Sequence, residues 1–192
     1  MNAAKRMTWN FMLMTWVAAA SFLASCSSKS TKPVEEENLL SNGSFEVDGE
    51  PTLSGWTPAN SNLAEVVSQP APGGGDYSLQ LSADWFPTSG FVTSVVPELH
   101  DGDIVLLSAY VRAVGSSGGG SIGVYAGHPA RIVSSHSKTE ITYDTSWSLL
   151  SLTDTLTLGT SDSVWVKLSS LNTEIEQRIG QFDRVSLVRL DN

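Results

Sequence analysis

After residue 37 the chain alternates between apolar and polar residues with a period of two, the spacing of a β-strand with one buried face. Glycine, serine and proline separate the alternating runs and mark the turns between them. Helical periodicity is missing, except that 172–179 could form a turn or two of helix. The predicted strands are 39–47, 63–68, 77–84, 90–96, 103–114, 121–126, 147–157, 163–171 and 181–190.

Short strands at this spacing predict an all-β domain, an antiparallel β-sandwich of the jelly-roll type. The first strand would open the fold with Phe45 and Val47 on one face. The chain has 192 residues, which leaves room for one domain, from 38 to 192, once an N-terminal leader is set aside. The longer predicted loops are 48–62, 69–76, 85–89 and 127–146.

Residues 1–25 have the features of a secretory leader. Lys5 and Arg6 give it a positive start, and the apolar run that follows is too short and too often interrupted by polar residues to span a membrane. The run ends in Leu-Ala-Ser-Cys at 23–26, which resembles the cleavage box of bacterial lipoproteins. In such proteins the cysteine becomes the lipidated first residue.

The box implies that Cys26, the only cysteine, carries acyl chains such as palmitate and holds the domain on the bacterial cell envelope. Ser27, in place of the aspartate that retains lipoproteins in the inner membrane, favours the outer membrane. The polar residues of 26–37 would then form a flexible tether. The alternative is an ordinary signal peptide, which would leave Cys26 as a free thiol.

The mature part keeps all 20 acidic residues and loses two of the 11 basic ones, so its formal charge is −11 instead of −9. Such a surface repels phosphate backbones and anionic headgroups. The charge therefore disfavours nucleic acid as a partner, leaves membrane contact to the lipid, and favours a neutral polysaccharide over a polyanionic one.

Four predicted strands carry polar or aromatic side chains opposite their apolar row. If these strands are neighbours, the side chains form one outer face on which a sugar ring could stack and its hydroxyl groups could find partners. Trp85, in a predicted loop, could wall the same site or cover the core. Because aromatic residues also favour exposed strand positions, a purely structural role is the alternative. The candidate glycan-binding residues are Gln80, Trp85, Tyr110, Arg112, Tyr125, Trp165 and Lys167.

Several short motifs occur in the order of a known family pattern. They are Asn-Gly-Ser-Phe-Glu at 42–46, Gly-Trp at 55–56, Gly-Asp-Tyr-Ser-Leu at 75–79, the strand at 107–112, Trp147, and Phe-Asp-Arg-Val-Ser-Leu at 182–187. From 38 to 190 the chain resembles the galactose-binding-like jelly rolls that serve as carbohydrate-binding modules of families four, nine and twenty-two. The resemblance implies sugar binding without catalysis, and it implies that Trp56 and Trp147 pack in the core.

The last predicted strand places Asp183 on the side of Val185 and Leu187, where an unpaired carboxylate costs several kcal/mol. The family resemblance implies a structural calcium ion held by Glu46 and Asp183 together with backbone carbonyl groups. Arg184 stands where the family usually has a second aspartate, and it would compete with the ion. A salt bridge or backbone hydrogen bond to Asp183 is the alternative.

The sequence contains matches to catalytic motifs, but none has the surroundings that catalysis needs. The two Gly-x-Ser-x-Gly matches at 115–123 lie in a predicted hairpin with no helix after it, so they do not form a nucleophile elbow. The pairs Asp101/Asp103 and Asp154/Asp162 could serve a glycosidase, but aspartates are common in turns. We therefore expect non-catalytic binding of a neutral β-linked glycan. A lipoprotein that binds or assembles other envelope proteins is the second class, and a glycoside hydrolase or lyase is the third.

Overall fold

The computed structural model describes residues 37–83, 90–128, 134–171 and 178–190. The chain divides into two units, 1–34 and 35–192, and all described residues belong to the second. The strands are β1 (Glu46–Val47), β2 (Glu50–Pro51), β3 (Thr57–Pro58), β4 (Ala64–Val67), β5 (Ser78–Ala83), β6 (Phe91–Val96), β7 (Ile104–Val114), β8 (Gly120–Gly127), β9 (His136–Thr142), β10 (Ser148–Thr155), β11 (Ser163–Ser170) and β12 (Arg178–Leu190). One 3-10 turn, η1 (Ser61–Leu63), precedes β4.

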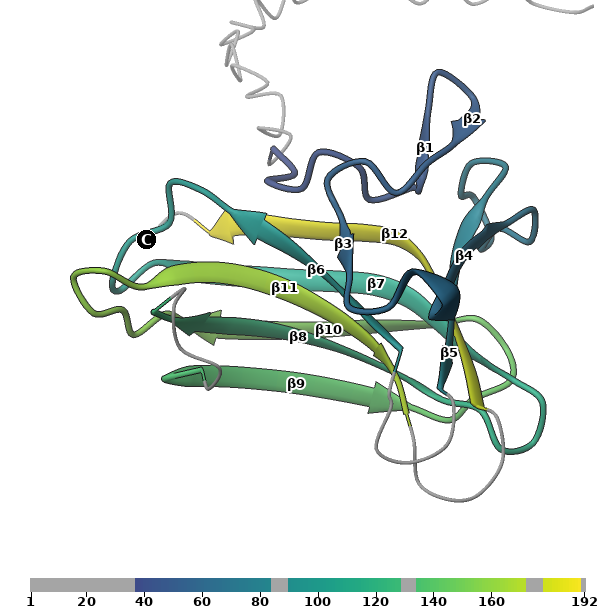
Figure 1. Ribbon diagram of the computed structural model, residues 1–192. Helices are drawn as coiled ribbons and strands as arrows, with labels where there is room; N and C mark the ends of the chain where they lie inside the picture. Colours follow the sequence, from purple (N-terminus) through teal and green to yellow (C-terminus); the bar gives the residue numbers. More distant parts are fainter. Residues whose placement is uncertain (1–36, 84–89, 129–133, 172–177, 191–192) are drawn as a thin grey trace, which may run out of the picture. The chain divides into compact units, whose positions relative to one another are not determined.

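Two five-stranded antiparallel sheets make up the domain (Figure 1). We call the sheet with the order β10-β7-β12-β5-β4 sheet I, and the sheet with the order β3-β6-β11-β8-β9 sheet II. A two-stranded ribbon, β1-β2, is separate from both. The predicted antiparallel β-sandwich is confirmed. Among the described residues no helix is long and apolar enough to cross a membrane.

The inner faces of the two sheets meet in one apolar core, as the alternation predicts. Strand β7 contributes Val105, Leu107, Ala109 and Val111, all fully buried, while the residues between them are half-buried on the outer side. Strands β8 and β11 contribute the facing rows of sheet II. The period of two therefore fixes which side chains lie inside and which lie on an outer face.

The predicted first strand, 39–47, is wrong except for its last two residues, Glu46 and Val47. Instead of pairing as a strand, the segment follows β12 through single hydrogen bonds, such as Leu39 N–H to the Leu187 carbonyl at 2.8 Å. Phe45 is buried in a left-handed conformation (φ 60°), whereas Val47 is 47% exposed, so the two do not share a face.

The predicted loop 127–146 contains a strand, β9, that alternation could not reveal. Its side chains are mostly exposed, because β9 forms the outer edge of sheet II and only Thr142 is buried. The predicted loop 48–62 likewise contains β2 and β3. Of the possible helix at 172–179, residues 172–177 lie outside the described part, and the remainder belongs to β12.

A β-bulge in β12 changes the predicted direction of Asp183. The register with β7 shifts between Asp183, which pairs with Tyr110, and Ser186, which pairs with Ser108. Since a bulge inserts one extra residue, Asp183 faces the outer side of sheet I together with Tyr110, while Val185 returns to the core. The prediction that Asp183 points toward the core is wrong, although the residue is fully buried.

Candidate functional site

The candidate glycan-binding residues lie on two opposite faces of the sandwich, not on one. Gln80, Tyr110 and Arg112 belong to β5 and β7 of sheet I, whereas β8 and β11 of sheet II carry the others, Tyr125, Trp165 and Lys167. The expectation that the four strands are neighbours is therefore wrong. Trp85 lies outside the described residues.

On sheet II, aromatic rings gather on the outer side of β6, β8 and β11. Tyr125 and Trp165 are direct cross-strand partners, and their rings lie nearly parallel, at 10° and with 6.1 Å between centroids. Gly123 and Gly127 leave space beside them: a methyl group at Gly123 would lie 2.7 Å from the Tyr125 ring, and one at Gly127 would lie 3.5 Å from the Trp165 ring. Gly123 therefore lets the Tyr125 ring lie over its strand position, whereas a methyl group at Gly127 would only touch the Trp165 ring.

Lys167 lies between these rings and Phe91. Its amino group is 4.2 Å from the centroid of Phe91 and 5.7 Å from that of Tyr125, within cation–π range. In the described part of the chain it forms neither a hydrogen bond nor an ion pair. Burial lowers the pKa of Lys167 and raises the pKa of Tyr125. The amino group therefore has N–H donors without an acceptor among the described residues, and it lies in a partly desolvated environment.

We call Phe91, Tyr125, Trp165 and Lys167 the aromatic face. Phe91 was missed from sequence, although the alternation of β6 puts it opposite the buried Val92. Such a face can stack on the C–H side of a sugar ring while the lysine donates to a hydroxyl group.

The outer face of sheet I holds a polar network instead. Gln181, fully buried, accepts from Arg112 Nε at 2.7 Å and donates to Gln80 at 2.9 Å and Gln69 at 3.1 Å. Arg112 also donates to Gln69 at 2.9 Å, and its guanidinium lies 4.7 Å from the Trp147 ring. These groups bind one another, so Gln80 and Arg112 have less capacity left for a ligand than the sequence suggested.

The two tryptophans expected in the core behave differently. Trp56 is buried against Phe45, with 5.7 Å between ring centroids, and donates its indole N–H to the Asn42 carbonyl at 2.6 Å. Trp147 is half-buried under Arg112 on the outer face of sheet I, so its predicted core position is wrong. Its place just before β10 does not by itself distinguish inside from outside.

Glu46 and Asp183 lie on either side of a glycine loop, 73–75. A methyl group at Gly74 would collide with the Asp183 carboxylate, and one at Gly75 with the Glu46 carboxylate. Asp183 accepts from the backbone N–H groups of Ala71 at 2.8 Å and Arg184 at 2.6 Å. Burial raises the pKa of Asp183, and the nearby Glu46 carboxylate adds to the rise.

Two carboxylates beside a loop that admits no side chain fit a hard cation such as calcium. The described residues contain no group of three or more His, Cys, Asp or Glu residues that could hold a metal. A calcium ion at Glu46 and Asp183 would therefore take its remaining oxygen ligands from backbone carbonyls and water.

The carboxylate pairs considered for glycosidase chemistry are engaged in local structure. Asp101 accepts from Leu158 N–H at 2.8 Å, and Asp103 accepts from His100 N–H at 2.8 Å. Asp154 contacts His136 at 2.7 Å across the edge strands β9 and β10. Asp162 accepts from Gly159 N–H at 2.9 Å. Each of the four thus holds a turn or an edge in place.

Comparison with known proteins supports the fold. No family model matches the sequence, and no curated protein matches it. Among solved structures, TmCBM61 in complex with β-1,4-galactotriose is similar with a TM-score of 0.56 and 18% identity, over 81% of this chain and 100% of that one. The CBM22-1 xylan-binding domain of Paenibacillus barcinonensis Xyn10C has a TM-score of 0.57 and 21% identity, over 82% and 97%.

A third similar structure contains a binding module joined to an enzyme. It is the N-terminal part of Clostridium thermocellum xylanase Xyn10B, with CBM22-1 and GH10 modules and xylohexaose, at a TM-score of 0.54 and 14% identity. The match covers 77% of this chain and 28% of that one. The domain therefore has the jelly-roll fold of carbohydrate-binding modules, as its motifs indicated.

Proposed function

We propose that this protein binds a neutral β-linked glycan, without catalysis, on the aromatic face of sheet II. The observation that carries the proposal is the amine of Lys167, which has no hydrogen-bond or ion-pair partner among the described residues and is held half-buried between Phe91 and Tyr125 beside Trp165. A polar group in such a place favours a partner that brings both hydroxyl groups and an apolar ring face. The neighbours that bind β-1,4-galactotriose and xylan support this class of ligand.

Isothermal titration of the purified protein against neutral β-1,4-linked oligosaccharides of galactose, xylose, glucose and mannose tests the proposal. We expect binding in the micromolar to millimolar range, because an open face covers only part of a sugar. Lys167→Met should weaken it, since methionine keeps the packing of the stem and removes the donors. Failure of every oligosaccharide to bind would refute the proposal, and stoichiometric capture of a single envelope protein would favour the second class.

We further propose that Cys26 is lipidated and that the domain is anchored to the bacterial outer membrane. The support is the Leu-Ala-Ser-Cys box at 23–26 followed by Ser27. More than one acyl chain is needed for stable anchoring, because each buried CH₂ contributes about 0.8 kcal/mol.

Replacement of Cys26 by serine should move the protein from the membrane fraction to the soluble fraction. The measurement is fractionation of producing bacteria, combined with the mass of the mature wild-type N-terminus. A Ser25→Ala variant, which keeps the cysteine, should remain in the membrane. An unmodified Cys26 in the mature wild-type protein would contradict the proposal.

We propose, finally, that Glu46 and Asp183 hold a structural calcium ion against the glycine loop 73–75. Calcium should raise the melting temperature of wild type by several degrees over that in chelator, because the ion binds the folded state only. Glu46→Gln should lose most of this difference. Glu50→Gln, on the exposed strand β2, is the matched control and should keep it. Equal melting temperatures with calcium and with chelator would exclude the ion.

The pH dependence of stability offers a separate check in chelator. Because the folded pKa of Asp183 is raised, the folded chain binds this proton more tightly, and the stability that the group contributes falls as pH rises through that pKa. The free energy of unfolding of wild type minus that of Asp183→Asn should therefore decrease as the pH rises above the ordinary pKa of an aspartate, about 4. With excess calcium the difference should increase instead. If this free-energy difference does not change with pH in chelator, the pKa of Asp183 is not raised in the folded protein.

A further inference from the structure

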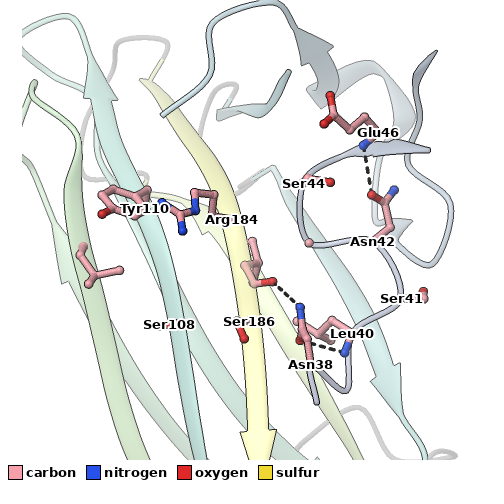
Figure 2. Close-up of a pocket in the computed structure, with 13 residues that line it drawn as sticks. Asn38, Leu40, Ser41, Asn42, Ser44, Glu46, Ser108, Tyr110, Arg184 and Ser186 are labelled. Atoms are coloured by element: carbon pink, nitrogen blue, oxygen red, sulfur yellow. Dashed lines mark hydrogen bonds between the residues drawn. The ribbon is translucent and has the colours of Figure 1, made fainter. Parts of the chain in front are cut away.

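A groove of about 560 Å³ opens on the outer face of sheet I, across the core from the aromatic face. One wall is the segment from Asn38 to Glu46, and the other side is formed by β7 and β12 (Figure 2). Asn38 fixes the wall to β12, since its side chain donates to the Val185 carbonyl at 3.1 Å and accepts from Leu187 N–H at 3.0 Å. These hydrogen bonds hold the wall of the groove in place against β12.

Two left-handed residues shape this groove. Arg184 (φ 50°) sits in the β12 bulge, and Phe45 (φ 60°) anchors the wall segment in the core. The bulge carries Arg184 out of the ladder, so that its guanidinium lies 5.3 Å from the Tyr110 ring and donates to the Pro72 carbonyl at 3.2 Å. Strained conformations of this kind persist where the surroundings enforce them, often at binding sites.

The lining combines an apolar surface with free hydroxyl groups. Tyr110 and Leu149 are cross-strand partners, and Leu149 is 58% exposed. The side-chain hydroxyls of Ser44, Ser108 and Ser186 form no hydrogen bond within the described ranges. A pyranose ring presents the complementary pattern, an apolar C–H face and hydroxyl groups that need partners. Arg184 and Glu46 carry opposite charges at the rim, which suits a neutral sugar.

We propose that this groove is a second saccharide-binding site, so that one domain holds two glycan chains at once and cross-links them. The inference rests on the proposed function of the aromatic face. Packed sheets lie about 10 Å apart, and the two sites point outward on opposite sides. A single extended chain cannot cover both sites, and simultaneous occupation joins separate chains.

The test measures stoichiometry and cross-linking with full-length protein. The probes are xylohexaose and β-1,4-galactotriose in titration calorimetry, and soluble xylan and β-1,4-galactan in light scattering. Ser108→Tyr fills the groove from an outward strand position, and Leu149→Gln removes apolar surface at an exposed one. Thr153→Tyr, exposed on the same sheet and outside the groove, is the control.

Wild type should bind two oligosaccharides per domain and cluster the polymer. Each groove variant should bind one and lose clustering, while the control behaves as wild type. If wild type binds one oligosaccharide, Trp165→Ala abolishes it and the groove variants change nothing, the second site is refuted and the proposed function stands. If Trp165→Ala changes nothing and the groove variants abolish binding, the groove is the sugar site and the aromatic face is not. If wild type binds neither these probes nor the β-1,4-linked oligosaccharides of glucose and mannose, both proposals fail.

Discussion

Trp165→Ala should weaken glycan binding by about tenfold or more, which corresponds to about 1.4 kcal/mol or more. The indole is the largest ring of the aromatic face and lies parallel to Tyr125 at 6.1 Å. Removing it takes away the surface on which a sugar ring would stack, and it also leaves Tyr125 without its lateral support. The measurement is titration calorimetry with the oligosaccharide that wild type binds best, at fixed salt and pH.

The control for this prediction is Tyr143→Ala, which removes another aromatic ring, 57% exposed, that lies beyond the end of β9. It should bind as wild type does. Because Trp165 points outward, Trp165→Ala should keep its melting temperature within a few degrees of wild type. Unchanged affinity in a folded Trp165→Ala protein would place the sugar elsewhere.

The sandwich and its core could be predicted from sequence because both follow from a period of two. Alternation assigns each residue to the inner or the outer side of its own strand, and for β7, β8 and β11 that assignment is correct. Which strands share a sheet depends on long-range pairing, which alternation does not encode. For this reason Tyr110 and Tyr125 were expected together, although they lie on opposite faces.

The positions that sequence reasoning missed have irregular backbone. Parity counts one residue as one step along a strand, so counting back across the bulge from the core residues Val185 and Leu187 gives the wrong side for Asp183. The wall segment has alternating residues but a left-handed Phe45, and it follows β12 without forming a strand. Arg184 is the residue at which this sequence differs from the family motif, and the bulge places its guanidinium over the Tyr110 ring.

The two outer faces differ in how far their polar groups are already satisfied. Gln80, Gln181 and Arg112 hydrogen-bond one another on sheet I, which stabilises the sheet and leaves little for a ligand. Within the residues described, the Lys167 amine lies over the rings of Phe91 and Tyr125 and forms no hydrogen bond or ion pair. Gln80, Arg112 and Lys167 are all polar and half-buried, and their hydrogen-bond partners separate the structural group from the candidate binding group.

Gly43→Ala should destabilise the fold by about 3 kcal/mol, one of the largest effects of a single methyl group in this chain. A Cβ at Gly43 would overlap the carbonyl oxygen of Val185, a backbone atom of the β12 bulge that cannot move aside as a flexible side chain would. The same contact includes the hydrogen bond from Val185 N–H to the Gly43 carbonyl at 2.8 Å, so the wall segment and the last strand would separate together. The melting temperature should fall by roughly 6 to 12 °C.

Gly102→Ala separates this collision from the general effect of replacing a glycine. Gly102 has φ 84° and no atom within 4 Å of an added Cβ, so alanine there meets only the left-handed backbone penalty of about 1 kcal/mol. Thermal unfolding followed by circular dichroism should rank the proteins wild type, Gly102→Ala, Gly43→Ala in decreasing stability. If Gly43→Ala melts at or above Gly102→Ala, the first segment does not close the fold against β12. If Gly43→Ala is instead the least stable protein, the ends of the domain are joined by the close approach of two backbones, that of segment 38–46 and that of β12. Side chains of a regular first strand would not be needed for this.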